Sequence, residues 1–241
     1  MCTMKKLHII TPVKDSISTA QDTIHSIVSS DTTVPFIYTV YNDFSTDENT
    51  AKLKQLSASK QFELVNLSDV TSHPSPNYLL VLQMAQQKAL ADGADLLIVE
   101  SDVQVDKHTI QALCEGACSL PGCGIAAAVT VNEKGKINYP YEYAAKWGKT
   151  VVDNHKHCSF CCSLLTHELL SKFDFHDLDS TKSWYDVTIS HKSLELGFKN
   201  YLFMNLPVCH RPHSSRPWKL LKYRNPILYY WRKYTKGLDK I

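Results

Sequence analysis

Two stretches of this chain share a pattern in which a continuous apolar run ends abruptly in acidic side chains. The run at 96–99 ends in the segment 100–102 (Glu-Ser-Asp), and the run at 36–41 ends in Asn42 and Asp43. Continuous apolar runs of this length predict parallel strands that helices cover on both faces. Ligands of such sheets bind beyond the carboxyl ends of the strands. Carboxylates at that edge suit a hard divalent cation with attached phosphates, so the pattern indicates a nucleotide site.

Short apolar runs and helical spacings alternate along most of the chain. Ile17, Ile24 and Ile27 follow helical spacing, for example, and Gly93 stands where a helix that begins at Pro76 would end. Repeated β-α-β units of this kind predict a parallel, doubly wound sheet. The predicted strands are 7–10, 36–41, 62–65, 95–100, 124–129, 161–165, 201–203 and 206–209, and the predicted helices are 17–28, one capped by Asp47 or Asn49, one from Pro76 to Leu90, 107–118, a short one around 168–170, and 183–197.

The bulk composition fits one large domain, or one domain with an appendage. The 241 residues are 44% apolar and 21% charged, which is ordinary for a globular protein with a sizeable core. No apolar run approaches the ~20 residues needed to span a bilayer. The first residues are too few and too polar for a signal peptide. We therefore expect a cytoplasmic protein whose eight cysteines are reduced thiols.

The densest group of cysteines is Cys158, Cys161 and Cys162, with His155 and His157 nearby. A structural zinc site is one interpretation of this group. It lacks a repeated C-x-x-C pair, however, and two of its cysteines open an apolar run. We therefore prefer buried free thiols that act as small hydrophobic side chains.

Charge is distributed unevenly along the chain. The segment 211–241 holds nine Lys and Arg residues and one acid, a net charge of +8, whereas the remainder carries −6. A mildly acidic domain therefore ends in a strongly basic tail. Nucleic acid is not expected as a partner, because the bases are confined to this tail.

Four segments, taken in order, resemble the family-2 glycosyltransferases. Residues 10–13 (Ile-Thr-Pro-Val) resemble the opening strand and turn, 42–47 (Asn-Asp-Phe-Ser-Thr-Asp) the D-D-G-S-T-D segment, 100–102 the D-x-D motif, and 184–198 the E-D helix that ends in G-Y. The resemblance covers about residues 6 to 212. It implies an α/β protein with the GT-A fold, a doubly wound and mostly parallel sheet flanked by helices. The expected division is a GT-A domain at 1–212 and a basic, aromatic helical extension at 213–241.

The resemblance also implies a metal site. Asp102, with Glu100, would hold Mn²⁺ or Mg²⁺, and His210 would add an imidazole because the family often places a metal-binding His after the last strand. Two alternatives stay open: Asp102 as the cap of the following helix, and His210 as a solvated loop residue.

A nucleoside-diphosphate sugar is the implied donor. Asp43 would hydrogen-bond its base or ribose, but the same segment, rich in turn-forming residues, also predicts an Asx-turn. Phe44 departs from the family, which usually has Gly there. The residues expected around the nucleotide are Thr11, Pro12, Val13, Asn42, Asp43, Ser45, Glu100 and Ser101.

Asp186 is the candidate catalytic base. Inverting transfer needs a carboxylate to accept the proton of the incoming hydroxyl, and a position near a helix start favours the ionised form. Tyr185 stands where the family has Glu, so an acid with only a structural role remains the alternative. A non-catalytic, nucleotide-binding relative of the same fold is the corresponding alternative for the whole chain.

The tail predicts a short helix, in which Asn225 is the cap and Pro226 the first residue. Aromatic and basic side chains are mixed in it, which suits the surface of an anionic membrane. The interpretation implies an enzyme at the inner face of the membrane, beside a glycan or lipid-linked glycan acceptor. The alternative is that the aromatic residues pack on the domain. The chain lacks the Q-x-x-R-W segment of the processive synthases, which favours addition of a single sugar.

Overall fold

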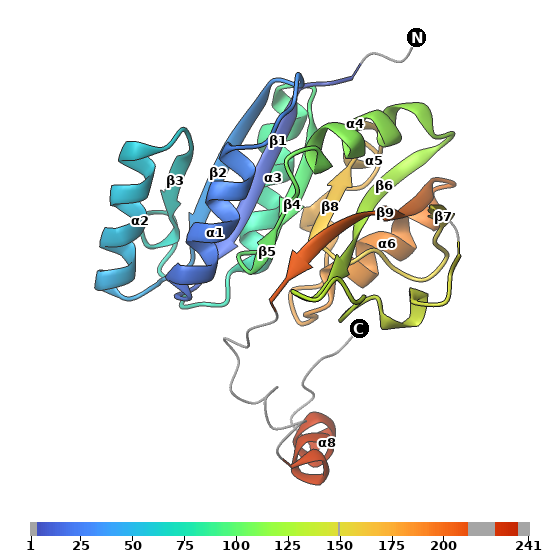
Figure 1. The fold of residues 1–241 in the computed structure, drawn as a ribbon. Coiled ribbons are helices and arrows are strands. Elements are labelled where there is room, and N and C mark those ends of the chain that lie inside the picture. Colours follow the sequence, from blue (N-terminus) through green and yellow to red (C-terminus); the bar gives the residue numbers. More distant parts are fainter. Residues whose placement is uncertain (1–3, 149, 212–224, 236–241) are drawn as a thin grey trace.

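The computed structural model describes residues 4–148, 150–211 and 225–235. The described strands form one sheet in the order β3-β2-β1-β4-β8-β6-β9-β5, with β7 paired to β9 (Figure 1). In this part of the chain β3, β2, β1, β4, β6 and β9 run in one direction, and β8, β5 and β7 run in the other. The strands are β1 (Leu7–Val13), β2 (Phe36–Asn42), β3 (Glu63–Asn66), β4 (Asp95–Val99), β5 (Val103–Gln104), β6 (Cys123–Val131), β7 (Val151–Asp153), β8 (Cys162–Leu165) and β9 (Lys199–His210).

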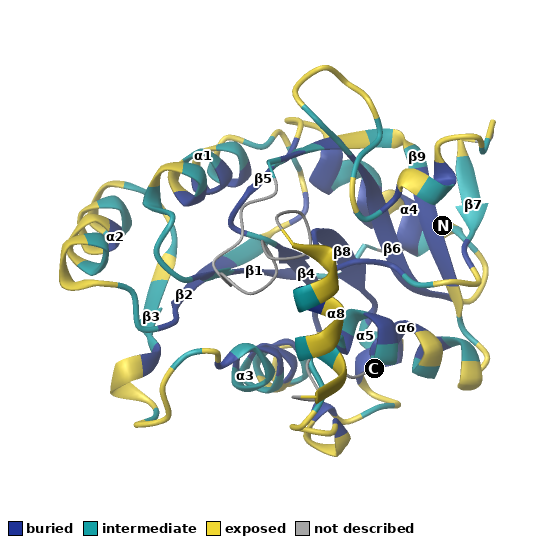
Figure 2. Ribbon diagram, turned by 90° about the horizontal axis from the view of Figure 1, so that it is seen from below, coloured by how far each residue is buried: buried dark blue, intermediate teal, exposed yellow. Residues whose placement is uncertain are grey.

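Helices cover both faces of this sheet (Figure 2). The helices α1, α2 and α4 lie over one face, and α3, α5 and α6 lie over the other. This arrangement is the mixed α/β fold that the sequence predicts. The helices are α1 (Ile17–Val28), α2 (Asp47–Ser59), α3 (Tyr78–Ala91), α4 (Thr109–Ser119), α5 (His167–Leu170), α6 (Tyr185–Glu195) and α8 (Pro226–Thr235), with 3-10 turns η1 (Leu67–Asp69), η2 (Glu142–Ala144) and η3 (Phe175–Asp177).

Strand β4 shows why the apolar runs are continuous. Its Leu97 and Val99 belong to the hydrophobic core on the α1 side, and Leu96 and Ile98 belong to the core on the α3 side. Successive side chains of a strand point to opposite faces, so a strand covered on both faces needs apolar residues at every position. The polar residues that follow it therefore mark the edge of the sheet.

Helices α3 and α2 are two of those whose starts differ from the predictions. The third helix begins at Tyr78 with Asn77 as its cap residue, two positions after Pro76. The α2 cap is Thr46, whose hydroxyl accepts a hydrogen bond from the Asn49 amide, and neither Asp47 nor Asn49 is the cap. Gly93 does follow the end of α3 with a positive φ of 62°.

The two strands predicted at 201–203 and 206–209 are one strand, β9, which runs from Lys199 to His210. Its pairing with β6 changes register between Ala128 and Val129, whose partners are Phe203 and Pro207. This irregularity absorbs Met204 and Asn205, the residues between the two predicted strands, without ending the strand.

The cysteine prediction holds for six described residues and fails for one. Cys158, Cys161 and Cys162 are buried free thiols, as are Cys114 and Cys123, and Cys209 is a half-buried free thiol. Cys118 is disulfide-bonded. Within the described ranges, every helix is too short or too polar to cross a membrane.

Candidate functional site

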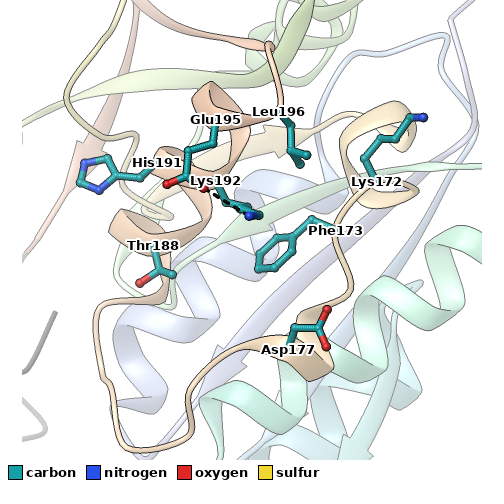
Figure 3. A pocket seen from close by; sticks show the side chains of 8 residues that line it. All are labelled: Lys172, Phe173, Asp177, Thr188, His191, Lys192, Glu195 and Leu196. Atoms are coloured by element: carbon teal, nitrogen blue, oxygen red, sulfur yellow. Dashed lines mark hydrogen bonds and ion pairs between the residues drawn. The ribbon is translucent and has the colours of Figure 1, made fainter.

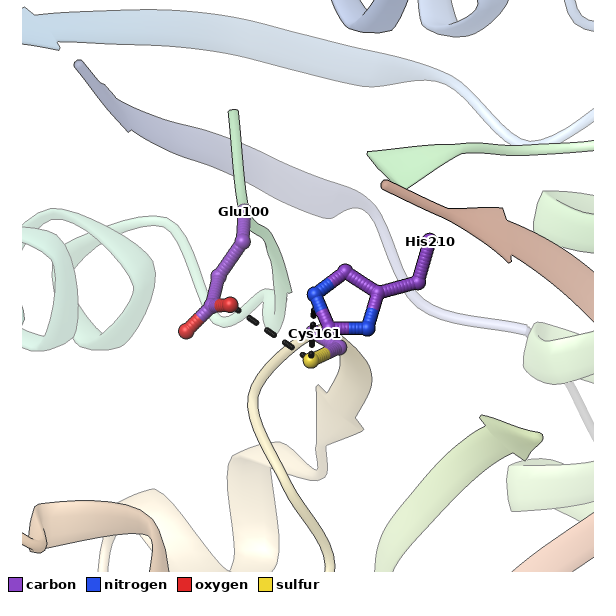
Figure 4. Close-up of side chains that lie close together, drawn as sticks. All are labelled: Glu100, Cys161 and His210. Carbon is purple, nitrogen blue, oxygen red and sulfur yellow. Dashed lines mark hydrogen bonds between the residues drawn. The ribbon is translucent and has the colours of Figure 1, made fainter. Parts of the chain in front are cut away.

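Four potential ligand side chains meet beyond the carboxyl end of β4. The Nε2 atom of His210 lies 3.6 Å from Oδ2 of Asp102, and the ligand atoms of Glu100, Cys161 and His210 lie within 4.8 Å of one another (Figure 4). Asp102 and His210 are almost fully buried, at 7% and 4% exposure. The structure therefore brings together the three residues that the sequence predicts around a cation, and adds Cys161.

Backbone pairing explains how residues so far apart in the sequence meet. After β4 the chain turns at Ser101 and Asp102 into β5, in which Val103 pairs with His210 of β9. The amide of Arg211 donates to the carbonyl of Asp102 at 2.9 Å, which continues the same pairing. The ends of β4 and β9 therefore place the carboxylate and the imidazole side by side.

The tautomer of His210 follows from its second ring nitrogen. Nδ1 lies 2.7 Å from the backbone carbonyl oxygen of Tyr139, an atom that can only accept. Nδ1 must therefore carry the hydrogen and donate it, so in the neutral ring Nε2 keeps a free lone pair. That nitrogen faces Asp102, Glu100 and Cys161, which is the orientation of a metal-ligating imidazole.

The carboxylates repel each other in the absence of a cation. Burial and, after it, the charges of Asp102 and Asp186 raise the pKa of Glu100 to about 7, against the attraction of His210. Burial lowers the pKa of His210, but its hydrogen bond to Asp102 and the charges of Asp102 and Glu100 outweigh this effect, so its pKa is raised. A group of acids that needs added positive charge is the electrostatic signature of a cation site.

The donor atoms fit the expected ion. Carboxylate oxygens from Asp102 and Glu100 with one imidazole nitrogen form a ligand set that suits Mn²⁺, and the oxygens also suit Mg²⁺. The helix after β5 begins at Thr109, and the carboxylate of Asp106 accepts a hydrogen bond from the amide of His108 in the turn before it. Asp102 itself faces His210, so capping that helix does not explain its position.

Asp186 lies in the first turn of α6, which begins at Tyr185. Its charge contributes to the raised pKa of Glu100 and of Cys158, so the carboxylate lies within electrostatic range of both groups. The ring of Tyr185 is buried and stacks on Tyr78 at a centroid distance of 6.5 Å. Tyr185 therefore packs in the core, and the catalytic role of Asp186 stays a prediction.

Asn42 and Ser45 build the turn after β2. The Oδ1 atom of Asn42 accepts from the amide of Ser45, three residues ahead, at 3.2 Å, whereas the predicted Asx-turn would bond the amide two residues ahead. The side-chain amide of Asn42 donates to Thr50 and Asn66, and the Ser45 hydroxyl accepts from the amide of Asp15. Both side chains therefore hold this turn against neighbouring elements.

Asp43 is tied to the loop that leads into α3. Its carboxylate accepts hydrogen bonds from the Ser75 hydroxyl at 2.7 Å, the Asn77 amide at 2.9 Å and the Asn77 side chain at 2.8 Å. Asp43 is 8% exposed. These bonds show that Asp43 anchors the loop, and its direct contact with a nucleotide stays a prediction.

The end of β1 lies between the end of β2, which carries Asn42 and Asp43, and the end of β4, which carries Glu100 and Asp102. Pairing of β1 with β4 ends at Ile10 with Ile98, whereas pairing with β2 continues to Val13 with Asn42. Thr11 is fully buried, and its hydroxyl accepts a hydrogen bond from Tyr38 at 2.9 Å. The side chain of Thr11 is therefore held in the core, and contact of Thr11, Pro12 and Val13 with a ligand stays a prediction.

Left-handed backbone conformations gather at the same edge. Asp15, Ser16 and Phe44 have φ values of 53°, 52° and 56°, which non-glycine residues rarely adopt. Phe44 therefore keeps the turn geometry for which the family uses Gly. The ammonium of Lys14 donates to the Phe44 carbonyl and joins the two turns.

A surface pocket of about 620 Å³ lies between α6 and the segment after α5 (Figure 3). Phe173 and Lys192 face each other across it, with the ammonium 5.9 Å from the ring centre. Its other lining residues come from the outer face of α6 and from the turn at Asp177. None of the predicted site residues lines this pocket, so we do not assign it to the chemistry.

Helix α8 carries its apolar side chains outward. Ile227, Tyr230, Trp231 and Tyr234 are 84%, 47%, 61% and 83% exposed, at the spacing of one helical face. Tyr229 is buried, and the Asn225 side chain accepts from the Leu228 amide, as expected for the cap. The helix lies on the side of the sheet at which β1, β4 and β9 end (Figures 1 and 2).

Two residues of the site escaped the sequence interpretation. Cys161 belongs to the cysteine group noted above, but only the pairing of β8 with β4 shows that it faces Glu100. Tyr139 contributes a backbone atom, for which the sequence holds no signal. The loop that contains it closes onto His210 through a second bond, in which the Asn138 side chain donates to the His210 carbonyl at 2.9 Å.

The fold resembles those of known glycosyltransferases. Neither a family model nor a curated protein matches the chain. Among solved structures, the mannosyltransferase PcManGT from Pyrobaculum calidifontis, in complex with GDP-Man and Mn²⁺, matches 99% of this chain with a TM-score of 0.64 and 12% identity. GalNAc-T7 with UDP, GalNAc and Mn²⁺ matches 88% (TM-score 0.64, 12% identity), and S. aureus TarS 1-349 with UDP-GlcNAc matches 87% (TM-score 0.61, 16% identity).

The matched regions make up only 66%, 44% and 60% of those three chains. The likeness therefore concerns their GT-A-type core. At these identities it establishes the architecture and leaves substrates and mechanism to be tested. The chain has the GT-A fold that the sequence resemblance predicts.

Proposed function

We propose that this protein is a metal-dependent glycosyltransferase that moves a single sugar from a nucleoside-diphosphate sugar to a glycan or lipid-linked glycan acceptor, with inversion. The observation that carries the proposal is the group of Glu100, Asp102 and His210 at the carboxyl edge of a GT-A sheet, in which Asp102 and His210 are buried and Glu100 is half-buried. Burial of a charge costs free energy, so two acids this close together do not stabilise the fold by themselves. A bound cation explains why both acids lie here.

Asp102 and His210 would hold this ion from the ends of β4 and β9, with Glu100 beside them. A divalent ion there supplies Lewis-acid stabilisation of the charge that develops on the leaving diphosphate. The hydrogen bond from Nδ1 of His210 to the Tyr139 carbonyl keeps Nε2 aimed at the ion. Mn²⁺ and Mg²⁺ are both compatible with the oxygen ligands.

The nucleotide part of the donor would lie against the end of β1. There, the backbone of Thr11, Pro12 and Val13 extends beyond the pairing with β4. The turn after β2 and the loop held by Asp43 would form the sides of this site. In this arrangement Asp43 would help to bind the nucleotide indirectly, by ordering this loop, in addition to the direct contact that the sequence predicts.

Asp186 would accept the proton of the incoming acceptor hydroxyl. A base on the far face of the sugar is required for inversion. The support for this role is that Asp186 opens α6 and lies within electrostatic range of Glu100. The helix dipole at this position favours the carboxylate form.

The outward apolar face of α8 supports a membrane location for the acceptor. Trp231 and Tyr234 suit the headgroup region of a bilayer, and Arg232 and Lys233 on the same helix suit anionic lipids. The net charge of +8 in segment 211–241 acts in the same direction. The enzyme would then work at the cytoplasmic face of the membrane on a lipid-linked glycan.

The test is turnover of a panel of nucleoside-diphosphate sugars by the full chain, followed as release of the nucleoside diphosphate, with Mn²⁺, Mg²⁺ or a chelator. We expect metal-dependent turnover with one donor, and a loss of 10²–10⁴-fold in Asp186→Asn without loss of donor binding. Asp106→Asn is the matched control, because Asn keeps the acceptor that the His108 amide uses. Thermal stabilisation by nucleotide and metal without turnover on any donor would instead identify a non-catalytic, nucleotide-binding protein.

A further inference from the structure

Cys161 is close enough to the cation site to take part in it. Its Sγ atom lies 3.4 Å from Oε2 of Glu100 and 4.0 Å from Nε2 of His210 (Figure 4). The residue is 2% exposed. With metal–ligand bonds of ~2.0–2.3 Å, the ligand atoms of a tetrahedral ion lie roughly 3.3–3.8 Å apart. The two distances from Sγ lie close to that range, and the three ligand atoms all lie within 4.8 Å of one another.

The backbone holds all three ligands in place. Strand β8 pairs with β4 so that Val99 lies opposite Cys162, and the Glu100 amide then donates to the Cys161 carbonyl at 3.0 Å. The Cys161 amide is itself held by the Ser159 hydroxyl. His210 is fixed independently, through β9 and the Tyr139 carbonyl. The group is therefore preorganised by separate contacts and does not depend on a flexible loop.

We propose that Cys161 supplies a sulfur ligand to the cation held by Glu100 and His210, so that the site prefers a borderline cation such as Zn²⁺ or Co²⁺ over Mg²⁺. Thiolate ligands select such ions, whereas an all-oxygen site would suit Mg²⁺ or Mn²⁺. On binding, a sulfur–metal bond replaces the S–H bond and the proton leaves to solvent. This inference rests on the metal site of the proposed function and specifies its selectivity.

A simpler role for Cys161 is to donate its S–H to Glu100 and fill space. Serine keeps a donor of similar size and removes the soft ligand, so Cys161→Ser separates the two roles. Cys162→Ala is the matched control, because it removes the adjacent buried thiol, which belongs to the hydrophobic core on the α1 side. Cys161→Ala provides a second variant, and the melting temperature of each metal-free protein reports whether it folds.

The experiment titrates the full chain with Co²⁺, Zn²⁺ and Mg²⁺ by absorption and calorimetry. The wild type and Cys162→Ala should show a sulfur-to-cobalt charge-transfer band that Cys161→Ser and Cys161→Ala lack. The Zn²⁺ affinity should fall by at least about tenfold in Cys161→Ser, with the Mg²⁺ affinity unchanged. The wild-type spectrum alone keeps the test decisive if both Cys161 variants fail to fold.

Cobalt binding without this band, or an unchanged preference for Zn²⁺ over Mg²⁺ in Cys161→Ser, would overturn the inference. Absence of any metal binding would overturn both this inference and the metal site of the proposed function. If the protein binds an ion through sulfur but turns over no sugar donor, the inference about Cys161 stands and the proposed activity is wrong.

Discussion

The imidazole of His210 faces the carboxylate of Asp102 at 3.6 Å because β5 and β9 pair next to both residues. The two side chains are buried together with Glu100 nearby. In the absence of a metal, Asp102 and Glu100 raise the pKa of His210, which favours the protonated imidazole and so compensates part of their negative charge. With a metal bound, the same nitrogen is free to coordinate. The pair thus limits the repulsion between the carboxylates both without a metal and with a metal bound.

Removal of the Asp102 charge should abolish tight metal binding. Asp102→Asn keeps the shape of the side chain but loses the anionic ligand, so we expect the Mn²⁺ affinity measured by calorimetry to fall by about 10²-fold or more. Turnover should fall with it. The exposed control Asp106→Asn should leave both unchanged. Equal Mn²⁺ affinity in wild type and Asp102→Asn would exclude Asp102 from the site.

The metal-free protein should become less stable as pH rises. The native pKa of Glu100 is raised to about 7, so its proton is held more tightly in the folded than in the unfolded chain between its ordinary value of 4.5 and 7. The pKa of His210 is also raised, and its contribution is likewise lost as pH rises. Both groups give the folded state more bound protons, so the free energy of unfolding falls across this window.

A fall of at least about 1 kcal/mol is expected between pH 5 and pH 8, or roughly 2–4 °C in melting temperature. Glu100→Gln should flatten most of this slope, and Glu115→Gln, at an exposed site on α4, should not. Excess Mn²⁺ should reverse the trend, because the deprotonated groups bind it. Stability that rises with pH in the metal-free wild type would contradict the electrostatic account of the site.

Loss of the Asp43 anchor should loosen the loop before α3. Asn77→Ala removes the side-chain hydrogen bonds to the Asp43 carboxylate and to the His73 carbonyl, so we expect the free energy of unfolding to fall by about 1.5–3 kcal/mol in chemical denaturation. The bond from the Asn77 backbone amide to Asp43 stays, so the loss should lie at the lower end of this range. The KM for the donor should rise. Ser57→Ala, on the exposed end of α2, should change neither quantity.

Ser16 offers a stabilising substitution beside the site. It has a φ of 52° and makes no capping hydrogen bond through its side chain, although it precedes α1. Glycine adopts this conformation without steric strain, so Ser16→Gly should raise the free energy of unfolding by about 0.5–1 kcal/mol. Ser18→Gly, inside α1, should lower it by a similar amount. Destabilisation by both changes would show that the backbone at Ser16 is not strained.

The outward face of α8 should bind anionic vesicles. We expect the full chain to co-sediment with vesicles that contain phosphatidylglycerol and to bind neutral phosphatidylcholine vesicles more weakly. The double variant Trp231→Ala and Tyr234→Ala should lose binding by about tenfold or more, because it removes the two largest exposed aromatic groups of that face. Val70→Ala, at an exposed apolar residue after η1, is the control. If the double variant binds anionic vesicles as well as the wild type does, the outward face of α8 is not the membrane-binding surface.

The local sequence pattern correctly predicted most of the helices and strands, and also the edge of the sheet at which the strands β2 and β4 end. The runs at 36–41 and 96–99 are strands because both of their faces are covered, and the acids after them mark the carboxyl edge. The predicted boundaries failed where polar and apolar signals conflict. Thr46 caps α2 in place of the acids that follow it, and β9 continues through a change of register that divides its apolar pattern in two.

The sequence by itself determined the order of most strands and helices, although not β5 and β7, and the presence of acids after β2 and β4, because hydrophobic periodicity acts over neighbouring residues. Only the tertiary structure decided which groups those acids meet. Asp43 binds the loop before α3, and Asp102 and Glu100 meet His210 and Cys161. These contacts depend on strand order and register, since a shift of one residue would turn Cys161 and His210 to the opposite face of the sheet.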